Sequence, residues 1–385
     1  MNRELCLKTD SSPYLDTLAF LNGDLYKKLT FLLLRFLGDV QYPFPLQIAK
    51  HKDMENFYFI GVDVSKKKLD FCVLLNGTIV LEEVVNNNIP SIRRFLETFL
   101  VDFKTSIDNL LVCAEHTGQY TFPLSIACQS LSCGLWLENP ARIKYSSGFS
   151  RGKNDKVDAH RIARYASRFS DNARYYQRPR EEIERLKQLR NEQDLYKSDL
   201  AKYKGQLSDQ REFMLDRVYQ EKAQRLERLI EELEKLIKDI DLLVETIIRS
   251  CRVLWRQREL LLSVEGVGPS VALCLIIETE AFTRFDDPRK FACHAGVAPF
   301  RYTSGSSQHS RNKVSQRANK QIKTLLHMAA LSITGRKSGE LKAYYERKVK
   351  EGKNKMTVIN AIRAKLIARM FAVIKKDQFY TPVYS

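Results

Sequence analysis

The sequence lacks any apolar segment long enough to span a membrane and any cysteine pattern of a disulfide or zinc framework. A membrane-spanning helix needs about 18 or more apolar residues. The longest run near the start, Leu29 to Leu37, is shorter and is interrupted by Arg35. The eight cysteines include no CxxC pair and no Cys/His cluster at zinc spacing. We therefore expect reduced core cysteines in a cytoplasmic protein with no secretory start and no membrane partner.

Proline and glycine are scarce in the middle of the chain. No proline lies between Pro179 and Pro269, and Gly205 is the one glycine between Pro179 and Gly266. Apolar residues recur there at three-four spacing, which predicts a coiled coil over residues 179–255. The frame slips between Leu207 and Leu226, so two helices joined near 208–222 and one helix with a stutter both fit. The segment either dimerises through its heptads or folds as a hairpin on its own chain.

Acidic residues are scarce in two segments, although the whole chain already carries a net charge of +17. Residues 301–376 contain 19 Lys or Arg against three acids, and residues 141–180 contain 11 against three. Such one-sided charge indicates a polyanion partner, with a merely solvated basic face as the alternative.

The stretch Phe57 to Leu75, FYFIGVDVSKKKLDFCVLL, places one acid inside an apolar run. Two strand-like segments flank a turn-like SKKK, and Asp63 lies in the first of them. A carboxylate among strand-forming apolar residues costs roughly several kcal/mol unless a cation or donor compensates it. Asp63 either is capped by backbone amides at a strand end or binds a cation, for which Mg²⁺ is the natural candidate.

Three further acids follow at informative positions. The apolar run Asn109 to Ala114 ends in Glu115, and the segment KNDKVDAHRIARYA places Asp155 and Asp158 on one helical face. Two acids at strand ends and two on a helix are what an RNase H-like nuclease needs to hold paired Mg²⁺ ions at a phosphodiester. Carboxylate ligands suit Mn²⁺ equally well.

The order of elements predicts an α/β, RNase H-like (RuvC-like) domain over residues 54–178. We expect strands at 57–64, 69–75, 78–85, 109–114 and 135–138, a turn at Asn76-Gly77, and helices at 90–101, 121–132 and 155–168. Residues 1–53 carry no readable chemistry. They form either an accessory segment or a stretch upstream of a true start at Met54.

A mainly helical C-terminal domain is expected over residues 256–385. Within LLSVEGVGPSVALCLIIE, residues 261–278, Gly266 and Gly268 separate two apolar helices. This pattern resembles a helix-hairpin-helix, which presents backbone amides to a DNA phosphate, although a plain helix-helix turn uses the same glycines.

A serine cluster follows, in which Ser304, Ser306 and Ser307 flank Gly305. Arg301 and Arg311 lie close in sequence. Serines in a Gly-Ser turn are usually loop residues, and one becomes a nucleophile only where cations or a base activate it. The residues alone leave this choice open.

Taken together, these motifs resemble the DEDD transposases of bacterial insertion sequences, the IS-one-ten family, which includes the Piv DNA invertases and bridge-RNA-guided recombinases. The resemblance runs from about Tyr58 to Leu331. It rests on GVDVSKKKLDF, AEHTGQY, KNDKVDAHRIA, and VEGVGPSVALCLIIE with FACHAGVAPFRYTSG, which occur in the family's order.

The resemblance implies a metal-binding tetrad of Asp63, Glu115, Asp155 and Asp158, with Ser304 as a nucleophile that forms a covalent phosphoserine with DNA. It also implies a composite site between subunits, a structured guide RNA encoded by the element, a homodimer or homotetramer, and a nucleoid-associated protein. The nucleic-acid contacts we expect come from Gly266, Gly268, Arg301, Arg311, Lys313, Arg317, Lys320 and Lys323.

The sequence departs from the family at one motif. Where the family usually has a Gly-Asn pair followed by Leu-Arg, this sequence reads Ala318-Asn319 and then Ile322-Lys323. Lysine keeps the positive charge of arginine but cannot form arginine's bidentate contact with a phosphate.

Two other functions fit the residues: a Holliday-junction-type endonuclease that uses water as nucleophile, and a non-catalytic nucleic-acid-binding coiled-coil protein.

Overall fold

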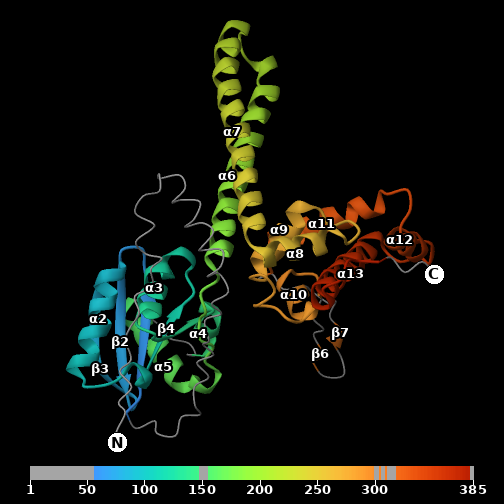
Figure 1. Cartoon of the computed structure of the whole chain (residues 1–385). Helices are drawn as coiled ribbons and strands as arrows, with labels where there is room; N and C mark the ends of the chain where they lie inside the picture. The colour runs from blue at the N-terminus through green and yellow to red at the C-terminus, as the bar shows by residue number, and fades with distance from the viewer. Residues whose placement is uncertain (1–55, 147–154, 299–302, 305–307, 310–317, 382–385) are drawn as a thin grey trace, which may run out of the picture. The chain divides into compact units, whose positions relative to one another are not determined.

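The structure is a computed structural model that describes residues 56–146, 155–298, 303–304, 308–309 and 318–381 (Figure 1). The chain divides into two compact units, residues 1–176 and 177–385. The predicted leader, residues 1–53, lies outside the described residues. The predicted coiled coil and C-terminal domain fall within the second unit.

The first unit is built on a five-stranded mixed sheet. Its strands are β1 (Tyr58–Val64), β2 (Lys68–Leu75), β3 (Thr78–Asn86), β4 (Leu110–Glu115) and β5 (Gly134–Glu138), in the order β3-β2-β1-β4-β5. The first three strands pair antiparallel, and β1, β4 and β5 run parallel. The predicted mixed α/β domain is confirmed, and its strands and helices follow one another in the predicted order. The turn at Asn76-Gly77 is also confirmed, with φ of 52° and 79°.

Helices cover both faces of this sheet. Phe95 and Leu96 of α2 (Ile89–Asp102) and Leu124 of α3 (Phe122–Ser130) pack with Ile60 and Val62 of β1. On the other face lie α4 (Pro140–Ser146) and α5 (Asp155–Arg168), whose apolar residues share a core cluster with alternate residues of the strands. Since strand side chains alternate between faces, each strand contributes to both cores. Within the described residues the seven cysteines are free, as predicted, and five of them are buried.

Helix α5 packs directly against β1 at Gly61. A Cβ atom built on Gly61 would lie 2.2 Å from the backbone nitrogen of Ala163 and 2.4 Å from the carbonyl oxygen of Ala159. Only glycine in the strand and small residues in the helix permit this approach. The buried, alanine-rich face of α5 that its periodicity predicts is therefore what brings the helix onto the sheet.

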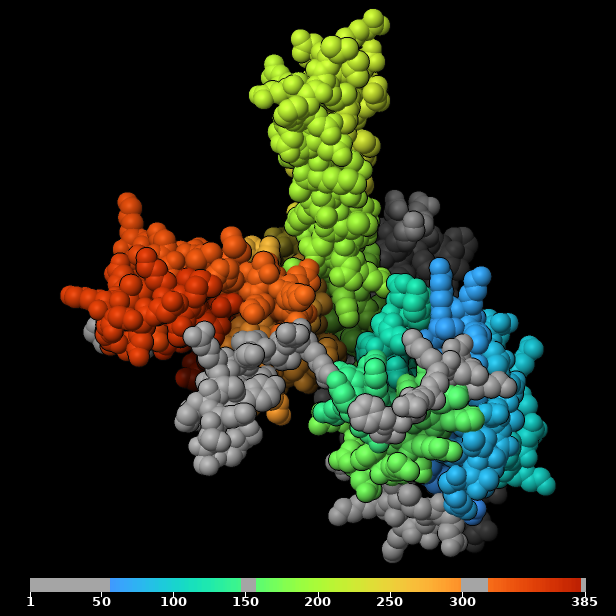
Figure 2. Space-filling view, turned by 180° about the vertical axis from the view of Figure 1, so that it is seen from behind, coloured from blue at the N-terminus to red at the C-terminus, as the bar shows by residue number. Residues whose placement is uncertain are grey.

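The second unit begins with two long helices, α6 (Glu181–Asp209) and α7 (Asp216–Ser250), separated by a short turn. Figure 2 shows them packed together along their length. Gln193 donates to Asp241 at 2.6 Å and Lys204 pairs with Glu234 at 2.6 Å, so the helices run antiparallel. Of the two predictions for this segment's continuity, two joined helices is correct and a single helix with a stutter is wrong.

The remaining helices share one apolar core with Ile183 and Leu186 of α6 and with Ile247 and Ile248 of α7. They are α8 (Arg252–Leu262), α9 (Pro269–Glu278), α10 (Pro288–His294), α11 (Lys320–Thr334), α12 (Glu340–Lys350) and α13 (Lys355–Lys376). Two short strands, β6 (Thr303–Ser304) and β7 (Gln308–His309), pair antiparallel. The predicted helical C-terminal region is confirmed. Across the described ranges, no helix is both long and apolar enough to cross a membrane.

The contact at Gly61 predicts that Gly61→Ala destabilises the first unit. The added methyl group meets helix backbone, which cannot rotate aside, so we expect a loss of at least about 2 kcal/mol in the free energy of unfolding. Urea denaturation followed by circular dichroism measures this loss. The matched control is Gly205→Ala in α6, where a Cβ meets no atom within 4 Å. It should leave stability unchanged or raise it by up to about 1 kcal/mol. Equal stability of both variants would contradict the prediction.

Candidate active site

Two of the predicted acids lie side by side at the ends of neighbouring parallel strands. Val62 of β1 is in register with Ala114 of β4, so Asp63 and Glu115 follow at the same level. Phe59 of β1 and Cys113 of β4 belong to the core under α5. Because side chains alternate along a strand, Asp63 and Glu115 project toward that same face.

The sheet extends this pair into a row of four acids. Asp70 on β2 is the register partner of Asp63, and Glu138 on β5 is the register partner of Glu115. Both outer acids are buried, at 4% and 8% relative exposure. Four carboxylates therefore cross four adjacent strands in the order Asp70, Asp63, Glu115, Glu138.

Helix α5 adds Asp158 and Arg161 above the row. The Arg161 guanidinium lies 3.0 Å from Asp158 Oδ1 and 3.5 Å from Glu115 Oε1, with the two contacts made by different nitrogens. Asp155 is the first residue of α5, one helical turn before Asp158, and its side chain lies outside the described residues. The structure thus brings Asp63, Glu115 and Asp158 to one end of the sheet from three separate elements.

Burial governs the electrostatics of these groups. The side chains of Glu115, Asp158 and Arg161 are 17%, 20% and 23% exposed. Burial raises the pKa of the Glu115 carboxyl, the Arg161 guanidinium opposes that rise, and the Asp158 carboxylate adds to it. Glu115 and Asp158 therefore repel each other in a partly desolvated environment. A cation between the two carboxylates reduces this repulsion.

The outer acids have other partners. Lys68 Nζ lies 3.1 Å from Asp70 Oδ2. Glu138 accepts hydrogen bonds from the Asn139 amide at 2.7 Å and the Tyr165 hydroxyl at 3.3 Å, and Arg142 lies 3.5 Å away. Burial, followed by the Glu138 carboxylate, raises the pKa of Tyr165 to about 12, so the hydroxyl remains a donor.

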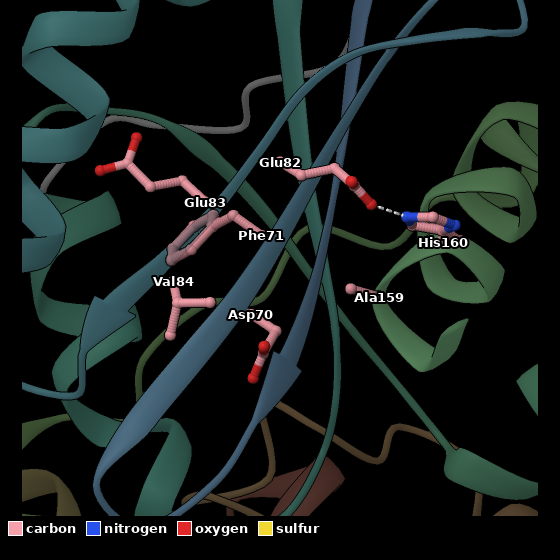
Figure 3. Close-up of a pocket in the computed structure, with 7 residues that line it drawn as sticks. All are labelled: Asp70, Phe71, Glu82, Glu83, Val84, Ala159 and His160. Carbon is pink, nitrogen blue, oxygen red and sulfur yellow. Dashed lines mark hydrogen bonds and ion pairs between the residues drawn. The ribbon is translucent and has the colours of Figure 1, made fainter. Parts of the chain in front are cut away.

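A small cavity of about 80 Å³ borders the other side of α5 (Figure 3). Glu82 reaches from β3 to a hydrogen bond with His160, whereas Glu83 points to the opposite side of the strand. Asp70 lines the same cavity. The volume suits a few water molecules and no larger ligand.

The carboxylates fit a hard divalent cation by the chemistry of their oxygen donors. Among the residues that the structure describes, however, no three His, Cys, Asp or Glu side chains stand close enough to ligate one ion. Arg161 lies between two of the acids. The predicted metal ligation by Asp63, Glu115, Asp155 and Asp158 stays a prediction.

The predicted nucleophile lies in the second unit. Ser304 is the last residue of β6 and is in register with Gln308 of β7. Its side chain lies outside the described residues, as do Ser306, Ser307, Arg301, Arg311, Lys313 and Arg317. The roles predicted for all of them stay predictions.

Asn319 starts α11 by capping it. Its side chain accepts hydrogen bonds from the amides of Gln321 and Ile322 and donates to Glu278 at 3.2 Å. Lys320 and Lys323 lie in the first turn of this helix. Ile322, which departs from the family pattern, is 2% exposed in the core.

The glycines of the α8–α9 turn have different surroundings. Gly266 has φ of 84°, and a Cβ there would lie 2.4 Å from Ile333 of α11. Glycine at position 266 therefore allows both the left-handed backbone of the turn and its close packing against Ile333. Gly268 is the N-cap of α9, and a Cβ there meets no atom within 4 Å. The turn between two helices is confirmed, and its contact with DNA stays a prediction.

Sequence reasoning missed Arg161, Asp70 and Glu138. Two signals were available: Arg161 follows Asp158 by three residues on the helix, and Asp70 alternates with Cys72 and Leu74, which face α5. Glu138 gave no signal before the register of β4 with β5 was known.

Part of the chain is similar to solved structures of RuvC from Thermus thermophilus. The free protein shares 13% sequence identity with a TM-score of 0.25, covering 31% of this chain and 100% of RuvC. RuvC in complex with a Holliday junction substrate shares 12% identity with a TM-score of 0.24, covering 31% of this chain and 99% of RuvC.

Curated relatives cover more of the sequence. The pilin gene-inverting proteins of Moraxella lacunata and Moraxella bovis are each 24% identical over 322 residues, which is 83% of this chain and 96% of theirs. The IS110 43.6 kDa protein of Streptomyces coelicolor is 26% identical over 121 residues, which is 31% of this chain and 29% of that protein.

Two family models match the chain in the order of its motifs. The IS110-type DEDD transposase model matches residues 60–220 and contains Asp63, Glu115, Asp155 and Asp158. The model described as "Transposase IS116/IS110/IS902 family" matches residues 258–346 and contains Ser304. Since these matches together span more than half of the sequence, the resemblance is confirmed, and the chain belongs to the IS110 family of DEDD transposases, enzymes that cut and recombine DNA.

Proposed function

We propose that this transposase moves its own insertion sequence by site-specific recombination, with the acids of the first unit and Ser304 of the second as its catalytic groups. The observation that carries this proposal is the convergence of Asp63, Glu115 and Asp158 at one end of the sheet. These acids come from two strands and a helix, far apart in the chain, and the order of elements alone does not require them to meet.

The acids act as oxygen ligands in this proposal. Asp63, Glu115, Asp155 and Asp158 would hold Mg²⁺, which when bound supplies charge stabilisation to the attacking and leaving oxygens of a phosphodiester. The neighbouring basic segment, residues 141–180, attracts the DNA backbone toward these acids.

Ser304 would attack the DNA phosphorus through its hydroxyl oxygen. The bond to the leaving sugar oxygen breaks, the serine proton goes to a base, and the DNA strand stays linked to the protein as a phosphoserine. The position of Ser304 directly before Gly305, inside the segment that the transposase family model matches, supports this role.

A guide RNA is the second proposed nucleic-acid partner, and it rests on family membership and on the basic segment over residues 301–376. Its binding would be dominated by phosphate contacts. The described cations available for it include Lys320, exposed at the start of α11, and Lys323 one turn later.

Self-association is proposed through α7. Leu229 and Leu243 are 49% and 43% exposed, and with half-buried Leu236 they form a stripe at heptad spacing that α6 leaves partly uncovered. A second copy of the hairpin would cover this stripe and complete a coiled coil between subunits.

We expect Asp158→Asn and Asp63→Asn each to lower strand transfer by at least about 1000-fold while DNA binding changes by less than about threefold. The substitutions remove a ligand charge and keep the basic surface. Strand transfer on element-end DNA and a gel-shift titration measure the two quantities. The matched control is Asp171→Asn, an exposed acid just beyond α5, which should keep both. Parallel loss of binding and activity would assign the two aspartates to DNA binding or folding.

A covalent protein-DNA band on a denaturing gel tests the serine. Wild-type protein with Mg²⁺, element-end DNA and RNA transcribed from the flanking non-coding sequence should give the band, and Ser304→Ala should abolish it. Ser306→Ala and Ser307→Ala serve as controls and should retain it. DNA cut without any adduct would instead identify an endonuclease that uses water as nucleophile.

The double variant Leu229→Lys with Leu243→Lys should reduce the oligomer mass measured by light scattering, because four charges per dimer seam cannot be buried without partners. Helix content by circular dichroism should stay unchanged, since both leucines are half exposed. The control adds the same two positive charges at exposed neutral sites of α7, Gln220→Lys with Gln224→Lys. An unchanged mass in the leucine variant would exclude this stripe as the subunit contact.

A further inference from the structure

The counter-charges of the acid row differ in origin. Asp70 pairs with Lys68, two residues earlier on the same strand, and Glu138 pairs with Arg142, four residues later in α4. These outer pairs are local in sequence. Glu115 and Asp158, by contrast, lie on different elements and share one guanidinium, that of Arg161.

The guanidinium of Arg161 contacts two different carboxylates, each through a single nitrogen. One nitrogen faces Asp158 at 3.0 Å, and the other faces Glu115 at the longer distance of 3.5 Å. The buried Nε makes no hydrogen bond. An arginine that grips one carboxylate with both nitrogens forms a stronger, bidentate pair. Arg161 instead offsets the charge of two carboxylates and forms a bidentate pair with neither.

We propose that Arg161 is a positioning residue that acts as the resident counter-ion of this site and yields Glu115 and Asp158 to the divalent metal when the metal binds. The inference rests on the proposed metal-binding role of these acids. Its physical basis is competition, because carboxylate oxygens that face a guanidinium are less available as ligands to a second cation.

Two consequences follow from this competition. In metal-free protein, Arg161 offsets the repulsion between two partly buried carboxylates and so stabilises the first unit. In metal-bound protein it lowers the affinity for the ion, since a positive charge remains close to the site. The rigid packing of α5 on β1 keeps the acids in place when the arginine is removed, so we expect loss of competition to outweigh loss of positioning.

The test compares Arg161→Gln with Arg164→Gln, an exposed arginine one turn nearer the helix end. Both variants lose one positive charge from α5. Without DNA, Mn²⁺ affinity is measured by titration calorimetry and the melting temperature is measured in EDTA. We expect Arg161→Gln to bind Mn²⁺ about tenfold more tightly and to melt several degrees lower in EDTA. Arg164→Gln should match wild type in both measurements, and Arg161→Lys should restore most of the wild-type affinity.

Mn²⁺ affinity that is unchanged or weaker in Arg161→Gln would overturn the inference while leaving the metal site intact. Failure of wild type to bind Mn²⁺ would instead reject the proposed metal site itself. If Arg161→Gln does not fold, the wild-type protein gives the answer through NMR of its arginine Nε–H groups. The Arg161 signal, identified by its absence in Arg161→Lys, should shift on addition of Mg²⁺, and a signal that stays in place overturns the inference.

Discussion

The contact between α5 and β1 at Gly61 is the constraint on which the candidate site depends. Because the strand has no side chain at that point, the helix backbone lies directly on the sheet. This contact fixes the distance of α5 from the sheet and brings Asp158 and Arg161 beside Glu115. A larger residue at position 61 would lift the helix and separate the acids of the helix from those of the strands.

Charge balance is the second constraint. A row of carboxylates across four strands is unfavourable in a partly buried place unless cations accompany it. The chain supplies Lys68 and Arg142 at the edges and Arg161 in the middle. Each part of the row therefore has a cation beside it, one at each edge and one between Glu115 and Asp158.

In the second unit, the packing of α6 against α7 leaves part of the apolar face of α7 uncovered. Helix α6 buries its apolar face against α7 within one chain, and Gln193 with Asp241 fixes the pairing. The heptad stripe of α7 is wider than one partner helix covers, so Leu229 and Leu243 stay half exposed. The hairpin and the intermolecular coiled coil, which the sequence presents as alternatives, are compatible because they use different parts of the same helix.

The sequence by itself determined the five strands β1 to β5, the helices α2, α3 and α5, and the identity of most acids, but it did not predict α4. The predicted strands and helices agree with the structure to within about two residues at nearly every boundary, because alternation and helical periodicity are local properties of the chain. Asp63 and Glu115 were recognisable as polar residues closing apolar strands. Only the tertiary structure decided which charges meet. The register of β1 with β2 and of β4 with β5 places Asp70 and Glu138 in the row, and the approach of α5 at Gly61 sets Arg161 between Glu115 and Asp158. Such contacts join residues far apart in sequence, and no local pattern encodes them.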